Sequence, residues 1–536
     1  MNLYVGEDAM KQWLRKYALL FPVLLVITGV CLLFSCRKSG MFIDEIYTYG
    51  LSNSHFAPFL QDVAGGDLHD RLLTRQQLFE YVAVDHGELW DFASVYDNQV
   101  RDVHPPLYYW LFNAVSSLTP DVFSKWTGLA LDYVIYLWAL LALWRLVMAL
   151  YDSPANAAAT VALYGLSTIG LSTMLMIRMY VLMTALTVEL AVLIVRLMRR
   201  PKAICYPLVG LVIFLGLMTQ YYFVFYAFFL CGFFVLRQLA RRQYRSMGAF
   251  AACAFGGVAL LVLCFPACLD QLFAEKLVSG GNALENLSLV SQYAGRLGII
   301  FARLRHGLHA PLYLLPVLLL LLLLCGGGLA SAKKLGLLRF DGLIVLLPAV
   351  ITLPLVAVIS PVTEERYLYN LIPILLTLWS LLLHLIEQGM RRLPRKELWK
   401  NAAAIAILAL SLWEARTVPP DYLYPEYRDY DAALAPYAGS PCVYMTDGYF
   451  APLTQDLLQL MTFEDFFVTG EPDSEALDAY LDQRKGESCV VYIDRSAFWG
   501  SGFVPEEMLP RLLGSTDYTG WEPLYENGLS AAYLLT

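Results

Sequence analysis

Two adjacent carboxylates, Asp44 and Glu45, follow the first apolar stretch of the chain, in the segment MFIDEIYTYG at residues 41–50. A carboxylate at a membrane surface can act as a general base on a hydroxyl or amine, and a neighbouring acid shifts its working pKa. Adjacent acids also occur in ordinary solvated loops. The functional interpretation of the pair therefore depends on which other polar residues reach the same surface.

Asp102 and His104 form a second candidate group, immediately before the Pro-Pro-Leu-Tyr-Tyr run at residues 105–109. A carboxylate and an imidazole so close together suit contact with an acceptor, with a phosphate or with a divalent metal ion. One such pair alone is a weak metal signal, so all three interpretations stay open. A divalent metal ion is the one cofactor that the sequence suggests.

Arg178, in MIRMY, and Arg366, in TEERYLY, lie at the ends of apolar stretches. Arginine at such a position is costly unless it pairs with a carboxylate or contacts an anion. The functional interpretation is a clamp on a lipid phosphate. The structural alternative is local pairing, for Arg366 with Glu364 or Glu365.

Tyrosines accompany these arginines: Tyr367 follows Arg366, and Tyr221 and Tyr222 stand in QYYF between two apolar stretches. Tyrosine is enriched at membrane interfaces without any further role, whereas stacking against a sugar is the functional alternative. We group these tyrosines with the arginines as candidate substrate-binding residues.

The elements that must position these residues are membrane-spanning helices. The chain of 536 residues is 58% hydrophobic and 16% charged, and runs of about 20 apolar residues recur up to residue 416. An all-α polytopic membrane protein of 11 to 13 spans is the fold class that fits. The expected segments are residues 17–34, 127–150, 154–173, 179–198, 204–219, 221–238, 247–268, 310–330, 342–360, 366–386 and 399–416. We interpret the first as an uncleaved anchor, because no small-residue cleavage site follows it.

Loop charge predicts the topology. Basic clusters fall at residues 199–202, 237–245, 333–339 and 391–400, and the positive-inside rule assigns them to the cytoplasm. Eleven crossings, with the N-terminus inside and the C-terminus outside, satisfy this pattern if the short segment 105–118 is not a full crossing; thirteen is the alternative. Arg37 and Lys38 are the exception, which we explain by snorkelling to lipid headgroups. This topology places every candidate residue on the outer face of the plasma membrane.

Charge also divides the chain into two regions. From residue 418 onward there are 20 acidic and 5 basic residues, which gives this tail a net charge of −15. The rest of the chain carries +7, and the two parts sum to the net charge of −8. We expect a membrane domain at residues 1–417, with short amphipathic helices around 71–84 in the outer loop 41–103, and a small mixed α/β domain outside the membrane at 418–536. Its strands are predicted at CVYM, CVVYI and AAYLLT, and its helices at residues 454–460 and 474–483. Cys442 and Cys489 are either disulfide-bonded or two buried thiols. Nothing suggests nucleic-acid binding.

Five motifs in this order resemble the GT-C glycosyltransferases: the early Asp-Glu, His-Pro-Pro-Leu-Tyr-Tyr, Arg-Met-Tyr, Gln-Tyr-Tyr-Phe, and the late Glu-Arg-Tyr followed by Pro373. The likeness covers residues 17–416 and is to the branch of protein O-mannosyltransferases and lipid A aminoarabinose transferases (family 39-like, bacterial). It implies that Asp44 is the catalytic base with Glu45 as its neighbour, that Asp102 and His104 contact acceptor, metal or carrier phosphate, and that Arg366 contacts the carrier phosphate. Gln220 stands where many relatives have histidine, so a metal or proton role for that turn does not carry over.

The resemblance implies transfer of a sugar, hexosyl or pentosyl, from a polyprenyl-phosphate donor to a protein, cell-envelope polymer or glycolipid, with inversion at the anomeric carbon. The sequence contains no Gly-rich phosphate loop, which fits a lipid-linked rather than a nucleotide-linked donor. The competing class is a lipid or solute transporter, and a membrane scaffold is third. The long polar outer loop that carries the acids disfavours a transporter, whose polar residues would gather at the bilayer midplane.

Overall fold

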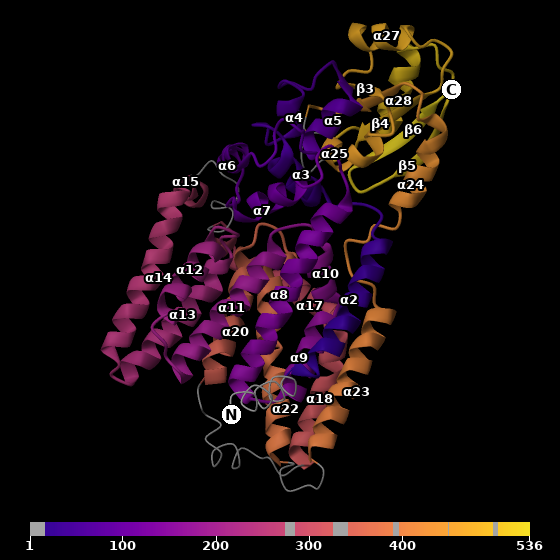
Figure 1. The fold of residues 1–536 in the computed structure, drawn as a ribbon. Helices are drawn as coiled ribbons and strands as arrows, with labels where there is room; N and C mark the ends of the chain where they lie inside the picture. The colour runs from indigo at the N-terminus through magenta and orange to yellow at the C-terminus, as the bar shows by residue number, and fades with distance from the viewer. Residues whose placement is uncertain (1–16, 274–284, 325–340, 390–395, 449, 497–501) are drawn as a thin grey trace, which may run out of the picture. The chain divides into compact units, whose positions relative to one another are not determined.

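The computed structural model describes residues 17–273, 285–324, 341–389, 396–448, 450–496 and 502–536 (Figure 1). The chain forms two compact units. Unit 1 consists of residues 1–35, 103–108 and 129–421, and unit 2 of residues 36–102, 109–128 and 422–536. Each unit thus combines segments that are far apart in the sequence.

Unit 1 is a bundle of apolar helices (Figure 1). In chain order its helices are α2 (Leu20–Arg37), α8 (Lys125–Tyr151), α9 (Pro154–Gly165), α10 (Thr168–Leu175), α11 (Tyr180–Arg199), α12 (Cys205–Leu217), α13 (Phe223–Ala240), α14 (Tyr244–Cys264), α15 (Ala267–Phe273), η1 (Val290–Gln292), α17 (Tyr293–Gly307), α18 (His309–Leu324), α20 (Asp341–Ile359), η2 (Glu365–Leu371), α21 (Ile372–Leu375), α22 (Thr377–Gly389) and α23 (Lys396–Thr417). The central helix α11 is almost wholly buried, which explains why it is apolar on every side.

Within the described residues, seven helices are long and apolar enough to cross a bilayer. The number is nine if each of two bent pairs is one crossing: α9 with α10, bent by 63°, and α17 with α18, bent by 86°. The expected eleven is reached only if α12, with 13 residues, and α23, which carries several charges, also cross. A polytopic membrane protein is confirmed. Helix α7 (Leu107–Ser116) has ten residues, about 15 Å, and is too short to span.

One carboxylate ties several helix ends together in unit 1. Asp341, the first residue of α20, lies 3.2 Å from Arg199 Nε at the end of α11 and 3.5 Å from Arg237 Nη2 of α13. Arg199 also donates to the Leu150 carbonyl oxygen of α8 at 2.8 Å. Two of the basic clusters found in the sequence therefore supply ion pairs that join α11, α13 and α20, and a hydrogen bond adds α8.

Unit 2 combines short helices with one six-stranded sheet. Its elements are α3 (Ile43–Asn53), α4 (Leu60–Val63), β1 (Arg71–Thr74), α5 (Arg75–Val82), α6 (Phe92–Arg101), most of α7, α24 (Tyr427–Leu434), η4 (Ala435–Tyr437), β2 (Cys442–Met445), α25 (Phe450–Gln455), α26 (Leu457–Leu460), β3 (Asp465–Thr469), α27 (Glu475–Asp482), β4 (Cys489–Asp494), α28 (Pro505–Ser515), β5 (Trp521–Glu526) and β6 (Ser530–Leu535).

The strand order is β1-β3-β2-β4-β6-β5, with β2 parallel to both β3 and β4. In this register Val443 lies opposite Phe467 on one side and Val491 on the other. Parallel strands that are buried on both faces read as continuous apolar runs, which is why CVYM and CVVYI were recognisable. Helices α27 and α28 contribute Leu477 and Leu509 to the same core.

The structure corrects three expectations. Residues 71–74 form strand β1, which pairs antiparallel with β3, rather than the start of an amphipathic helix. The outer loop consequently folds with the tail in one unit, and the expected division at residue 417 does not separate two independent domains. Cys442 and Cys489 lie on neighbouring strands as free, buried thiols, so the disulfide alternative is wrong.

Candidate functional site

The acidic pair lies in the first turn of α3, in unit 2. Phe42 precedes the helix in an extended conformation, and its N–H donates to the Glu45 carboxylate at 2.6 Å. A carboxylate three residues into a helix satisfies one of the backbone donors that a helix start leaves open. The acids therefore stand at a fixed helix start and not in a mobile loop. Asp44 is half-buried, whereas Glu45 is inaccessible to water.

Glu45 is also the partner of Lys38. The Lys38 ammonium lies 2.9 Å from the Glu45 carboxylate, and both side chains are fully buried. The same ammonium donates to the Tyr422 carbonyl oxygen at 2.7 Å and lies over the Tyr424 ring. Lys38 thus joins α3 to the segment that follows α23, and the expectation that it snorkels to lipid is wrong.

Close packing and two hydrogen bonds fix α3 in unit 2. Gly50 faces Tyr81 of α5 so closely that an added Cβ would lie 2.0 Å from the ring. The Asn53 amide donates to the Val82 carbonyl oxygen at 2.7 Å, and the Tyr49 hydroxyl donates to the Ser124 carbonyl oxygen at 2.7 Å. A helix fixed in this way holds the Asp44 carboxylate in one place, which a general base requires.

Asp102 and His104 follow the end of α6, at the boundary where the chain passes from unit 2 to unit 1. Both are half-buried. Within unit 1, the Leu107 N–H donates to the Met218 carbonyl oxygen at 3.0 Å, and the Tyr108 hydroxyl donates to Asp132 at 2.7 Å. These bonds hold the segment that carries His104 beside the turn at residues 218–222.

That turn also meets the candidate arginine segment of unit 1. The Tyr222 ring packs against Tyr367 with centroids 4.9 Å apart, and Tyr180 meets Tyr367 edge-on at 6.0 Å. The Arg366 guanidinium lies over the Tyr367 ring at 5.4 Å, and its Nε is 2.8 Å from Glu364. Three turns that were singled out separately in the sequence therefore converge on one aromatic and cationic cluster.

The members of this cluster differ in burial and direction. Arg178 is 4% and Arg366 7% exposed, so both guanidiniums are held inside the unit. Tyr221 departs from the group, since its hydroxyl donates to Gln271 of α15 at 2.6 Å. Pairing of Arg366 with Glu364, the structural alternative, is present in the structure. A guanidinium has five N–H donors, so one pair with a carboxylate is compatible with contact to an anion as well.

A neighbouring cavity of about 370 Å³ was not anticipated. It is lined by Ile169, Ala302, Arg303, His306, Gly307, Glu365 and Asp421. Arg303 pairs with Glu365 at 2.8 Å, and Asp421 accepts a hydrogen bond from the Ser172 hydroxyl at 3.2 Å. Loss of hydration, followed by the nearby Glu365 carboxylate, raises the pKa of Asp421. Only the Arg-x-x-His spacing at 303–306, on an amphipathic helix, offered a signal for this cavity in the sequence.

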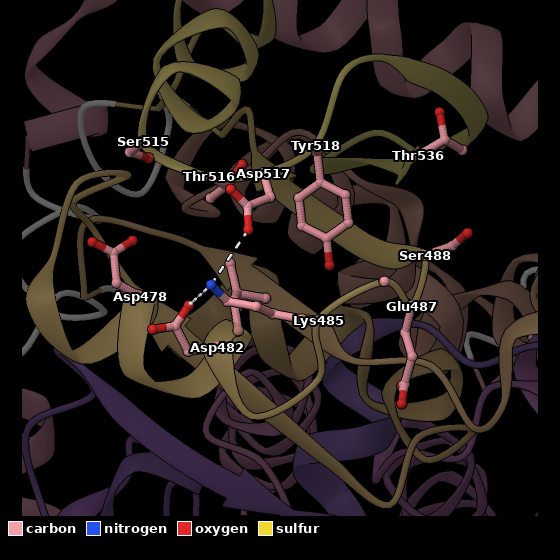
Figure 2. A pocket seen from close by; sticks show the side chains of 12 residues that line it. Asp478, Asp482, Lys485, Glu487, Ser488, Ser515, Thr516, Asp517, Tyr518 and Thr536 are labelled. Carbon is pink, nitrogen blue, oxygen red and sulfur yellow. Dashed lines mark ion pairs between the residues drawn. The ribbon is translucent and has the colours of Figure 1, made fainter.

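A crevice in unit 2 has the opposite character. A crevice of about 420 Å³ between α27 and the residues after α28 is surrounded by carboxylates, and Lys485 bridges Asp482 at 3.2 Å and Asp517 at 3.5 Å (Figure 2). All three side chains are mostly exposed, so these pairs contribute little stability. A crevice lined by carboxylates does not suit a phosphate.

A metal site needs several His, Cys, Asp or Glu side chains that lie close together. Within the residues that the structure describes, no group of three or more His, Cys, Asp or Glu side chains could hold a metal ion together. Asp102 and His104 do not make a complete ligand set on these grounds. We therefore derive no step through a metal ion, and metal binding stays a prediction.

The sequence of residues 103–267 matches a family model described as dolichyl-phosphate-mannose-protein mannosyltransferase. The matched region contains the His-Pro-Pro-Leu-Tyr-Tyr, Arg-Met-Tyr and Gln-Tyr-Tyr-Phe motifs and lies between the acidic pair and Arg366. No curated protein sequence matches the chain.

Solved structures are similar over nearly the full length. ArnT from Cupriavidus metallidurans bound to undecaprenyl phosphate has a TM-score of 0.51 at 11% identity, covering 97% of this chain and 98% of that one. Its apo state has a TM-score of 0.49 at 12% identity, covering 98% of both chains. The Archaeoglobus fulgidus oligosaccharyltransferase tethered with an acceptor peptide has a TM-score of 0.44 at 11% identity, covering 97% of this chain and 74% of that one.

The apolar helical bundle and the fold likeness to the first of these structures define a membrane protein of the GT-C fold. The family match over residues 103–267 agrees with the resemblance to GT-C membrane glycosyltransferases that the motif order predicted.

Proposed function

We propose that this protein transfers a hexosyl or pentosyl group from a polyprenyl-phosphate carrier to an acceptor outside the cytoplasm. The acceptor is a protein, a cell-envelope polymer or a glycolipid. The N-terminus lies in the cytoplasm, and unit 2 faces outward. The similar ArnT structure binds undecaprenyl phosphate, which supports a lipid-linked donor for this chain.

The observation that carries the proposal is the cluster around Arg366 in unit 1. A buried guanidinium beside Tyr222 and Tyr367 combines a charge for a phosphate with ring faces for a sugar. Arg178 is buried beside Tyr180, whose ring meets the same Tyr367. Asp44 stands at the start of the short helix α3 and not within a long apolar helix, whereas the polar sites of transporters lie near the bilayer midplane.

The chemistry is one displacement at the sugar anomeric carbon. Asp44 accepts the proton of the acceptor hydroxyl or amine, whose lone pair forms the new bond to that carbon as the bond to the phosphate oxygen breaks. The leaving phosphate takes the electron pair, and Arg366 stabilises its added charge. Inversion at the anomeric carbon follows from a single step.

The other predicted residues have supporting roles in this proposal. Asp102 and His104 contact the acceptor or the carrier phosphate, and Tyr221 borders the sugar site through its turn. Glu45 positions Asp44 by fixing the first turn of α3. A dependence of activity on Mn²⁺ that disappears in His104→Ala would support a metal at Asp102 and His104.

The test is mass spectrometry of envelope glycans and glycolipids from cells carrying the wild-type chain, a deletion or Asp44→Asn. We expect one defined sugar to disappear from one acceptor in both mutants while its polyprenyl-linked donor accumulates. Such a result would identify the sugar and the acceptor together.

Asp429→Asn is the matched control, because Asp429 also lies in the first turn of a helix of unit 2 but is exposed. It should leave the glycans unchanged. An unchanged glycome in Asp44→Asn, with an undecorated lipid stranded on the inner leaflet, would instead favour lipid movement and refute Asp44 as a base.

A further inference from the structure

A second polar cavity of unit 1 lies among the ends of four helices, within two of the basic clusters. It has a volume of about 520 Å³ and is lined by Leu197, Pro201, Tyr206, Gln238, Arg242, Gln243, Tyr244, Arg245 and Ser246. The lining contains two arginines, several amides and hydroxyls, and no carboxylate. Its charge is therefore suited to an anion.

The floor of this cavity is a fixed chain of hydrogen bonds. Arg237 donates to the Gln238 side-chain oxygen at 3.2 Å, which leaves the Gln238 NH₂ to donate to the Ser246 hydroxyl at 2.6 Å. Because arginine can only donate, the orientation of the Gln238 amide is determined. Gln238 is 2% exposed, so this arrangement is built into the protein interior.

The same chain leaves one hydroxyl proton for a ligand. The Tyr206 and Ser246 hydroxyl oxygens lie 2.8 Å apart, and either can be the donor. Ser246 already accepts from Gln238, so whichever hydroxyl donates within the pair, the other keeps an O–H to offer. An acceptor-rich group, such as a phosphate, satisfies this donor together with the arginines.

Backbone geometry adds to this picture. Arg242 has a φ of +54° in the turn between α13 and α14, a position where glycine is usually preferred. Arg245 lies in the first turn of α14, a helix of 21 residues whose N-cap residue, Gln243, makes no side-chain capping bond. The start of a helix favours negative charge, so it reinforces the two guanidiniums.

Exposed hydrophobic side chains beside the cavity indicate that the anion belongs to a membrane lipid. Large hydrophobic side chains at the starts of α12 and α14 are exposed: Ile204, the N-cap residue of α12, is 61% exposed, and Tyr244, the first residue of α14, is 57% exposed. Exposed apolar groups beside a basic pocket at a helix end match a lipid whose headgroup enters the pocket and whose chains lie along the helices.

We propose that this cavity, defined by Tyr206, Arg242, Arg245 and Ser246, binds the headgroup phosphate of an anionic membrane lipid. The site lies at the end of the bundle that carries the basic clusters, which the loop charges assign to the cytoplasmic leaflet. Its lining contains none of the candidate donor-binding residues, and the proposal does not depend on the transferase chemistry.

The experiment is native mass spectrometry of the full chain, delipidated in detergent and titrated with phosphatidylglycerol or, for comparison, phosphatidylcholine. The double variant R242Q/R245Q should weaken phosphatidylglycerol binding about 10- to 30-fold, at about 1 kcal/mol per basic residue at a membrane surface. Both arginines are exposed, so the variant should keep the thermal unfolding temperature of the wild type.

The control is R391Q/R392Q, which removes the same charge from another basic cluster and whose positions lie outside the described residues. It should retain wild-type binding. An equal loss in this control, or equal affinity for phosphatidylcholine, would overturn the proposal. Displacement of phosphatidylglycerol from the wild-type chain by inorganic phosphate would show a site for soluble anions and would overturn the lipid assignment.

Discussion

At the scale of single residues, Glu45 and Asp44 have different surroundings although they are neighbours in the sequence. Glu45 accepts from the Phe42 N–H and from Lys38 in a fully buried setting. Asp44 is half-buried and projects from the same turn. We infer that Glu45 holds the turn and that Asp44 carries the proposed proton transfer.

Substitution of Lys38 tests this division. Lys38→Met leaves the Glu45 carboxylate buried without its charge partner. We therefore expect the free energy of opening of α3 to fall by about 3–5 kcal/mol. The double variant Lys38→Met/Glu45→Met should lose less than Lys38→Met alone, because no charge is then left unpaired. Hydrogen exchange of the α3 amides in the full chain measures both effects.

Lys485→Met is the control, since the Lys485 pairs with Asp482 and Asp517 are exposed. Its removal should leave the exchange of α3 unchanged, because exposed ion pairs contribute little to stability. If Lys38→Met left the exchange of α3 unchanged, Glu45 would not be a structural acid, and a direct catalytic role would regain weight.

At the scale of elements, the packing of α3 on α5 depends on the absence of a side chain at position 50. Gly50→Ala places a methyl group 2.0 Å from the original position of the Tyr81 ring, so the helix or the ring must move. We expect unfolding of unit 2 to become easier by about 1–3 kcal/mol, as in other overpacked cores. Transfer activity should fall with it, because Asp44 is carried by α3.

Gly514→Ala provides the comparison within the same unit. Gly514 lies in helix α28, and nothing within 4 Å would meet its Cβ. Alanine is the better helix former, so this change should be neutral or stabilising by up to about 1 kcal/mol. Thermal unfolding of both variants distinguishes the close contact at Gly50 from a general effect of replacing glycine.

The sheet responds to pH through a buried acid. Asp456 accepts from the Tyr444 hydroxyl at 2.9 Å and from Asn527 at 2.6 Å, and burial raises its pKa from 3.8 to about 6. The folded state thus holds this proton more tightly than the unfolded chain, and the resulting stability is present below pH 4 and lost as the pH rises through about 6.

We therefore expect unit 2 to become more stable on acidification from pH 7 towards pH 4, by on the order of 3 kcal/mol for this group. Hydrogen exchange of the β2 and β4 amides, corrected for the intrinsic effect of pH, measures the trend. Asp456→Asn should flatten it. An equally steep trend in that variant would assign the pH dependence to other carboxyls, of which Asp494 is the first to examine.

Sequence patterns predicted some elements much better than others. Helix α11 is a long apolar run, and the buried strands β2, β4 and β6 are short apolar runs. Both patterns are typical of their secondary structure. Strand β1 was missed because RLLT is short, and only its pairing with β3, about 390 residues later, makes it a strand. Local pattern carries no information about such distant pairing.

The candidate site divides in the same way. Arg366, Tyr222 and Tyr367 were found by residue type at the ends of apolar stretches, and the structure brings them together. Arg303 and Asp421 were missed because each is an ordinary surface residue in its own sequence context. The role of Lys38 was also hidden, since its partners are Glu45, seven residues later, and Tyr422, far along the chain.

At the scale of the whole molecule, the acidic helix depends on the tail for its fold. Strand β1 pairs with β3, Lys38 bonds to the Tyr422 carbonyl oxygen, and the Ser39 N–H donates to the Leu423 carbonyl oxygen at 2.7 Å. The tail is therefore part of the structure that holds Asp44, and not a removable cap.

Deletion of residues 422–536 should consequently expose residues 36–102 to proteolysis and abolish transfer, even though Asp44 is retained. Cleavage at a protease site inserted beside Gly439, in the turn before β2, is the control. It breaks the chain but leaves every strand whole, because Gly439 lies outside all the strands, so β1 can still pair with β3 across the cut. The nicked protein should remain assembled and active. A deleted chain that kept residues 36–102 protected and still transferred sugar would show that the membrane unit alone suffices to hold the acid.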